Sequence, residues 1–96
     1  MNKIGLTTLA GQFGKVQPQG LTISLPRNYD ILRFGEHRDC LSLWISADPE
    51  APNEDVGFEL CVTGDSVPTA AHFIGSIEDR FGTVWFLWMH DKGKIK

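Results

Sequence analysis

The segment Cys40–Gly75 constrains the fold of this 96-residue chain more than any other part. Near its start and again at Val56–Thr63, apolar and polar residues alternate with a period of two, which predicts half-buried β-strands. The intervening segment Ala47–Asp55 holds two prolines and four acidic residues, so we expect a loop there. No segment has the apolar period of a convincing amphipathic helix.

Short strands are also expected on both sides of this segment, separated by loops that contain glycine and proline. They are predicted at Ile4–Thr8, Leu21–Leu25, Tyr29–Phe34, Phe73–Ile77 and Phe81–Met89. Six to seven short strands predict a mainly β fold, a small antiparallel β-sandwich or partly open β-barrel, with room for one short helix at Ala70–His72. Residues 1–96 are expected to form a single β domain, with a weakly patterned N-terminal segment (1–20) and a basic tail (91–96).

The alternation also predicts which side chains face inward. Ile4 and Leu6 are expected to point into the core, whereas the hydroxyls of Ser42 and Ser46 are expected to mark a solvent face. The segment Phe81–Met89 shows no polar alternation. We therefore expect a central strand that is covered on both sides, or a strand with one face against another subunit.

The composition is that of an ordinary small globular domain, with 42% apolar and 22% charged residues. A chain of this length buries a modest core, so homo-oligomerisation is an expected further source of stability. No apolar run approaches the roughly 18 residues that span a bilayer. Because Met1–Gly5 does not begin a signal peptide either, we expect a cytoplasmic protein without a membrane partner.

The two cysteines, Cys40 and Cys61, both fall on predicted strands. The simplest interpretation is a pair of separate buried thiols. A disulfide or a reactive pair is the alternative, and a reducing compartment would oppose the disulfide.

The net charge of −3 conceals an uneven distribution of charge along the chain. Nine acidic residues and no Lys or Arg lie between positions 39 and 79: Asp39, Asp48, Glu50, Glu54, Asp55, Glu59, Asp65, Glu78 and Asp79. This run predicts either a solvated acidic face or a surface that meets a basic groove on a partner. Direct binding of nucleic acid is disfavoured because it requires clustered cations.

No arrangement of residues indicates catalysis or a bound metal. The three histidines, His37, His72 and His90, have no metal-ligand spacing, and neither CxxC nor HExxH occurs. The acidic residues of Ala47–Asp55 lack the spacing of a calcium-binding EF-hand. We therefore expect a protein that is not an enzyme and that needs no cofactor or metal.

Two groups of residues are candidates for binding. Tryptophan dominates interface hot spots, so Trp44, Trp85 and Trp88 are candidate contact residues, together with the acidic Asp48, Glu50, Glu54 and Asp55. The second group is the predicted turn of Thr63, Gly64, Asp65 and Ser66. Its backbone N–H groups could hold an anion, or Asp65 could simply bond to the backbone of its own turn.

A set of short motifs links the chain to known proteins. The motifs are Leu43-Trp44, Asp48–Pro52, Phe58, Thr63-Gly64, Pro68 and Ile74-Gly75. Over about residues 21–90 this pattern resembles a family of small phage-encoded proteins classed as a domain of unknown function. The chain has Asp65 where that family commonly has His. The resemblance implies a phage or prophage origin and a shared fold, and it carries over no catalytic residue.

Three functions are compatible with these observations. The first is a non-enzymatic phage accessory protein in the cytoplasm of the infected bacterial host. Such a protein would bind and inhibit a host protein or complex, for example a CRISPR-type or similar anti-phage defence complex, through an acidic surface. The second is an oligomeric binder that sequesters a nucleotide signal by Trp stacking and the Thr63–Ser66 turn, with Arg33, Arg38 and Arg80 supplying positive charge. The third is a virion or assembly protein.

Overall fold

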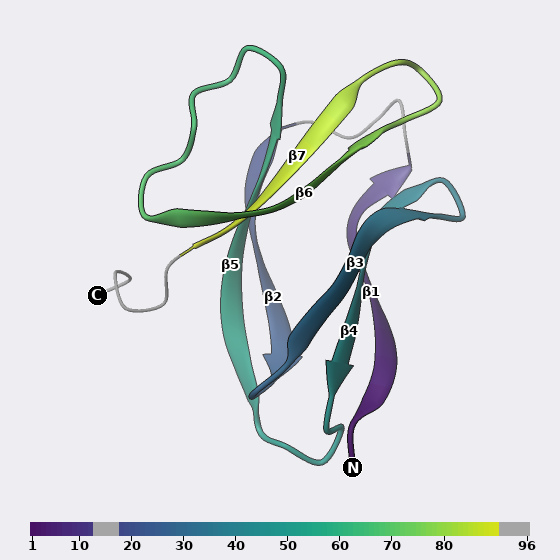
Figure 1. Cartoon of the computed structure of the whole chain (residues 1–96), viewed down its shortest axis with the longest axis vertical. Helices are drawn as coiled ribbons and strands as arrows, with labels where there is room; N and C mark the ends of the chain where they lie inside the picture. Colours follow the sequence, from purple (N-terminus) through teal and green to yellow (C-terminus); the bar gives the residue numbers. More distant parts are fainter. Residues whose placement is uncertain (13–17, 91–96) are drawn as a thin grey trace.

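A computed structural model describes residues 1–12 and 18–90 of the chain, so the predicted basic tail (91–96) lies outside the described residues. Seven strands follow one another along the chain (Figure 1). They are β1 (Lys3–Gln12), β2 (Gln19–Pro26), β3 (Asp30–His37), β4 (Cys40–Ala47), β5 (Asn53–Val62), β6 (Ala71–Glu78) and β7 (Val84–His90). Within the described residues no helix forms. The short helix expected at Ala70–His72 is absent there because β6 already begins at Ala71. Accordingly, no helix within residues 1–12 and 18–90 could cross a membrane.

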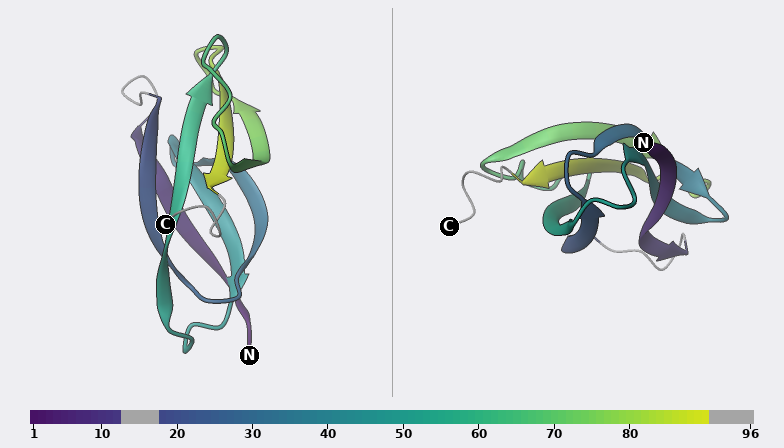
Figure 2. Two further views of the ribbon diagram at one scale, coloured as in Figure 1. Left: turned by 90° about the vertical axis from the view of Figure 1, so that its left-hand side faces the viewer. Right: turned by 90° about the horizontal axis from the view of Figure 1, so that it is seen from below.

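The strands form two antiparallel sheets that pack face to face (Figure 2), which confirms the predicted β-sandwich. The first sheet has the order β1-β4-β3 and the second the order β2-β5-β7-β6. On one side of the sandwich β3 lies against β6. On the other side β1 and β2 end their sheets, and neither pairs with the other among the described residues. The sandwich is therefore open between β1 and β2.

The core lies between the two sheets and is built mainly from β4, β5 and β7. The predicted alternation of β4 and β5 is confirmed, because every second residue faces inward. The largest fully buried side chains are Phe58, Leu25, Leu41, Leu43, Leu60, Leu87 and Val56. β7 lies between β5 and β6, so it is the expected central strand of its sheet. It is not covered on both sides, because Trp85 and Leu87 are buried in the core whereas Phe86 and Trp88 on its other face stay partly exposed.

The expected inward face of the first strand is wrong. Ile4 is 73% exposed and Leu6 is exposed as well, and both share the outer face of the sheet with their pairing partners Ser46 and Trp44. The register of β1 against β4 shifts after Thr8. The inward positions before this shift are Gly5 and Thr7, which pair with the buried Ile45 and Leu43, and both line the open side of the sandwich. The buried part of β1 therefore comes later, at residues 9 and 10.

The expected solvent exposure of Ser42 is wrong too. Ser42 is fully buried, and its hydroxyl donates to the Cys40 carbonyl over 3.4 Å. Its partner on β3 is Gly35, and the long side chain of Arg33 lies over that glycine. A strand pattern cannot show that a long neighbouring side chain covers a small polar residue.

The acidic loop is shorter than expected. The loop predicted to run to Asp55 ends at Pro52, because β5 begins at Asn53 and pairs with the end of β2. Glu54 and Asp55 are therefore strand residues with fixed backbones.

Candidate functional site

An aromatic cluster lies on the outer face of β6 and β7. Phe73 pairs with Trp88 across the two strands, and their ring centroids are 5.2 Å apart. The ring of Phe86 lies 6.4 Å from that of Phe73. Inward-facing Trp85 and Leu87 alternate with these outward residues along β7. We call Phe73, Phe86 and Trp88 the aromatic face.

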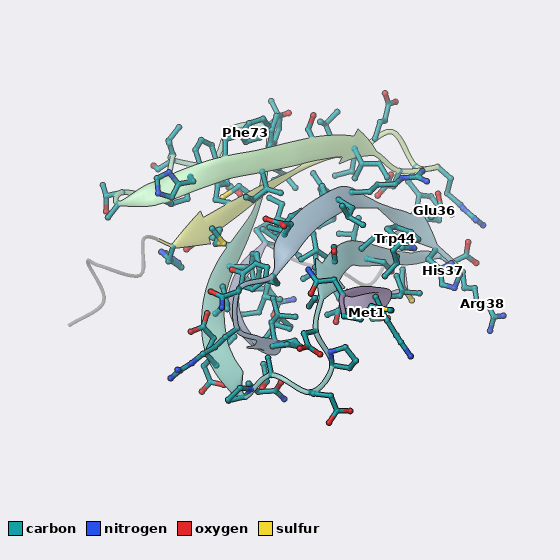
Figure 3. The ribbon with its side chains drawn as sticks, turned by 60° about the horizontal axis from the view of Figure 1, so that its bottom comes forward. Met1, Glu36, His37, Arg38, Trp44 and Phe73 are labelled. Carbon is teal, nitrogen blue, oxygen red and sulfur yellow. The ribbon has the colours of Figure 1, made fainter. Side chains whose placement is uncertain are left out.

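The sequence analysis missed two residues of this face, Phe86 and the more exposed Phe73. Phe73 is 53% exposed and is labelled on the outer side of the second sheet in Figure 3. The available signal was its place on a strand whose other residues at that face are small or polar, such as Ser76. A large aromatic residue on such a face has no core to fill.

A hollow of about 300 Å³ adjoins the aromatic face. Its lining consists of Cys61, Val62, Thr63, Gly64, Asp65, Ser66, Val67, Phe86 and Trp88. The structure thus brings the predicted Thr63–Ser66 turn beside one of the predicted tryptophans. Exposed Val67 adds apolar surface at the rim.

Asp65 holds the turn of this hollow closed. Its N–H donates to the Val62 carbonyl over 3.0 Å, and its Oδ2 accepts the Val62 N–H at 2.9 Å. Gly64 has a φ of 102°, a conformation that glycine adopts without steric cost. Asp65 is thus bonded to its own turn, as the simpler of the two interpretations expects.

Among the described residues, no Lys or Arg lines the hollow. Arg33 lies on the other sheet, with its guanidinium 5.2 Å from the centroid of the Trp44 ring, and Arg80 pairs with Glu36 and Asp39. An anionic nucleotide in the hollow would therefore meet the Asp65 carboxylate without a compensating Lys or Arg from residues 1–12 and 18–90.

Cys61 contributes a buried thiol to the floor of the hollow. Burial raises the pKa of this thiol, and the negative charges of Glu59 and Asp65 raise it further. The neutral thiol is a poor nucleophile. Both cysteines are free, and Cys40 lies on β4 of the other sheet, where it is half-buried rather than buried.

The three tryptophans lie in three different environments. Trp44 is half-buried on the outer face of the first sheet, where the His37 ring meets it edge-on at 5.9 Å (Figure 3). Trp88 lies on the outer face of the second sheet. Trp85 is only 4% exposed, and its indole N–H donates to Asp79, so it is a core residue and not an accessible contact. One flat partner surface could not touch both Trp44 and Trp88.

The run of acidic residues is not one continuous surface. Asp79 is buried, Asp39 pairs with Arg80, and Glu59 pairs with His90 at 3.1 Å. The four predicted contact residues Asp48, Glu50, Glu54 and Asp55 are close to one another along the chain, in and just after the β4–β5 loop. We call this group the acidic end.

The acidic end also has cations near it. The Asp48 carboxylate lies 3.9 Å from the N-terminal ammonium and accepts the Glu50 N–H at 3.0 Å. The Arg27 N–H donates to the Pro52 carbonyl, which places the backbone of Arg27 beside the loop. Within residues 1–12 and 18–90, no three His, Cys, Asp or Glu side chains are arranged to hold a metal ion.

Comparisons with known proteins add a family but no activity. A family described as a domain of unknown function, DUF7352, matches residues 15–95. No curated protein and no solved structure shows significant similarity to the chain. The match covers most of the 96 residues, including all of β2 to β7. The chain therefore belongs to the DUF7352 family.

Proposed function

We propose that the protein is a non-enzymatic binding domain that engages another protein through its aromatic face. The observation that carries this proposal is the exposure of Phe73 beside Trp88 on the face of the second sheet that points away from the first sheet. Rigid aromatic side chains bury much area at low entropic cost, which is why they dominate interface hot spots. The adjoining hollow offers a pocket for a side chain of the partner.

The biological setting that we propose is that of a small phage accessory protein that blocks a host factor, such as a defence complex. The resemblance of the motifs from Leu43 to Gly75 to phage-encoded proteins supports this setting. The acidic end supports a partner with a basic surface, because complementary charge speeds association and selects the partner. The protein would then act in the cytoplasm of the infected host.

The aromatic face is tested by a double variant, Phe73→Ala with Trp88→Ala. We expect about 30-fold weaker retention of the host partner, the effect of losing a hot spot of about 2 kcal/mol. The measurement is recovery from host lysate on tagged protein, quantified by mass spectrometry. Phe81→Ala is the matched control, since Phe81 is also exposed but lies in the β6–β7 loop. Equal recovery by the double variant and the control would exclude the aromatic face.

The acidic end is tested separately by charge reversal. Glu50→Lys with Asp55→Lys is expected to slow association and to remove most of its dependence on salt, because exposed charges act mainly on the association rate. Both side chains are exposed, so the fold should tolerate the change. If the variant associates as fast as the wild type, and the association rate of neither protein depends on salt, the acidic end takes no part in binding.

A nucleotide ligand is the second candidate, and one observation favours it: the hollow brings the Thr63–Ser66 turn beside Trp88. We rank the nucleotide lower because the part of the chain that the structure describes contributes no Lys or Arg to that lining. Tryptophan fluorescence on addition of cyclic nucleotides distinguishes a nucleotide ligand from a protein partner. Quenching that Trp88→Phe abolishes would support the nucleotide, and light scattering of the same sample would report the proposed homo-oligomer.

A further inference from the structure

We propose a second binding site in the opening between β1 and β2, which accepts an extended peptide segment of a partner protein as an added β-strand. The segment that fits would alternate apolar with polar residues and carry a basic residue at the acidic end. The site uses residues that are all separate from the aromatic face, so it does not depend on binding at that face, although it shares the acidic end with the function proposed above.

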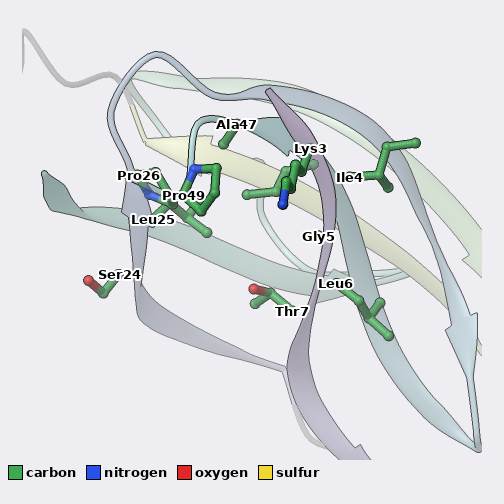
Figure 4. A pocket seen from close by; sticks show the side chains of 11 residues that line it. Lys3, Ile4, Gly5, Leu6, Thr7, Ser24, Leu25, Pro26, Ala47 and Pro49 are labelled. Carbon is green, nitrogen blue, oxygen red and sulfur yellow. The ribbon is translucent and has the colours of Figure 1, made fainter. Parts of the chain in front are cut away.

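The opening is a groove with an apolar floor. It has a volume of about 350 Å³, and Figure 4 shows the side chains around it. Leu25, Ile45 and Ala47 are core residues that also line the groove. The core of the sandwich is therefore reachable from this side, at a place where an added side chain would bury apolar surface.

The walls of the groove are two strand edges. β1 and β2 are the terminal strands of their sheets, and within the described residues neither has a pairing partner on the groove side. A free edge presents backbone N–H and C=O groups that pair readily with another extended chain. Alternate side chains of an inserted strand would point to the floor, and the others would point to solvent.

Gly5 keeps the groove open on the β1 side. A Cβ built at Gly5 would lie 3.9 Å from Cγ1 of Ile45, an ordinary contact distance, so a side chain there would stand over the floor. The missing side chain leaves room for a side chain of the peptide instead. The position is exposed and its backbone has no positive φ, so a larger residue is sterically allowed.

The charges at one end of the groove favour a basic residue in the peptide. Pro49 lines the groove and stands between Asp48 and Glu50, and Ser24, which also lines it, pairs with Asp55 on β5. Lys3 is the cation in the lining. Three acidic residues thus neighbour lining residues of this end along the chain or across the sheet, and Lys3 and the N-terminal ammonium, 3.9 Å from Asp48, are nearby positive charges.

The test uses a labelled peptide, Arg-Val-Thr-Val-Thr-Val-Arg, whose two end charges allow either orientation. Fluorescence anisotropy should show binding to the full chain, and Gly5→Val should weaken it at least about tenfold by filling the groove. Gly20→Val is the matched control on β2: its Cβ also meets only ordinary contacts, and Gly20 lies outside the groove lining. Valine suits strands, so both variants should keep the wild-type melting temperature. Equal binding by the two variants, or no binding by the wild type, would overturn the proposal.

Two further measurements separate main-chain pairing from other contacts. The backbone N–H groups of a peptide strand point alternately to its two edges. Two peptides are therefore N-methylated at alternate residues, one for each edge, and each should bind about tenfold more weakly than the parent peptide. If both methylated peptides bind like the parent peptide, strand addition is excluded. The Phe73→Ala, Trp88→Ala protein should bind the peptide with the wild-type affinity. The proposals for the groove and for the aromatic face are therefore tested independently of each other. A dimer that Gly5→Val dissociates would make a second copy of the chain the occupant and overturn the partner-peptide assignment.

Discussion

Replacing Asp79 by alanine is expected to destabilise the fold by about 3 kcal/mol, because it leaves three donors without their acceptor. Asp79 is only 7% exposed. Its Oδ1 accepts the N–H groups of Phe81 at 2.8 Å and Thr83 at 3.0 Å, and its Oδ2 accepts the indole N–H of Trp85 at 2.9 Å. One carboxylate thus ties the β6–β7 turn to a core side chain. Urea denaturation measures the loss, and a decrease below about 1 kcal/mol would contradict this role.

The same carboxylate predicts how stability changes with acid. Burial alone would raise the pKa of Asp79, but the hydrogen bonds from Trp85, Thr83 and Phe81 together lower it below its ordinary value of 3.8. A carboxyl whose pKa is lower in the folded state stabilises the fold above its unfolded pKa, and this contribution disappears as the pH falls through the folded pKa. The stability difference between the wild type and Asp79→Asn should therefore shrink below about pH 4. An equal difference at pH 7 and pH 3 would contradict the assignment.

Replacing Phe58 by alanine is expected to cost 3–5 kcal/mol, about the range found for truncated buried aromatic residues. Phe58 is fully buried on β5, between its pairing partners Leu21 of β2 and Met89 of β7. The truncation leaves a cavity that the paired strands around it cannot close. The midpoint of urea denaturation should fall strongly, and a domain of this size has only about 5–15 kcal/mol to lose.

Phe73→Ala is the matched control for this prediction. It makes the same chemical change on the same sheet, but on the exposed outer face. We expect a loss within about 1 kcal/mol. A loss as large as that of Phe58→Ala would mean that the aromatic face supports the fold, and the binding variants would then need more conservative replacements.

Strands β4 and β5 could be predicted because the alternation of apolar and polar residues that indicates a strand is a local property of the sequence. In β4 and β5 each inward residue is followed by an outward one, so the period of two states which residues share a face. The acidic loop was placed correctly from Asp48 to Pro52 but not at its two ends, since Ala47 pairs with Lys3 in the first sheet and Asn53 pairs with Pro26 in the second. Element ends depend on a partner strand that the local sequence does not contain.

The candidate site could be predicted only in part. Trp88 and the Thr63–Ser66 turn were both chosen from the sequence, and the structure brings them to one hollow. Trp85 was chosen by the same reasoning and lies in the core. The two residues are three apart on one strand, so alternation places them on opposite faces but does not say which face the other sheet covers.

The sequence by itself determined the class of the fold, since a period of two in several short segments separated by loops leaves the chain little except packed antiparallel strands. The tertiary structure alone decided which faces are covered, which acids are neutralised and where the sandwich stays open. Arg80 pairs with Asp39 across 41 residues of sequence, and the groove forms between two strands that never pair with each other. These features arise from contacts between distant segments, whose geometry exists only once both sheets have packed.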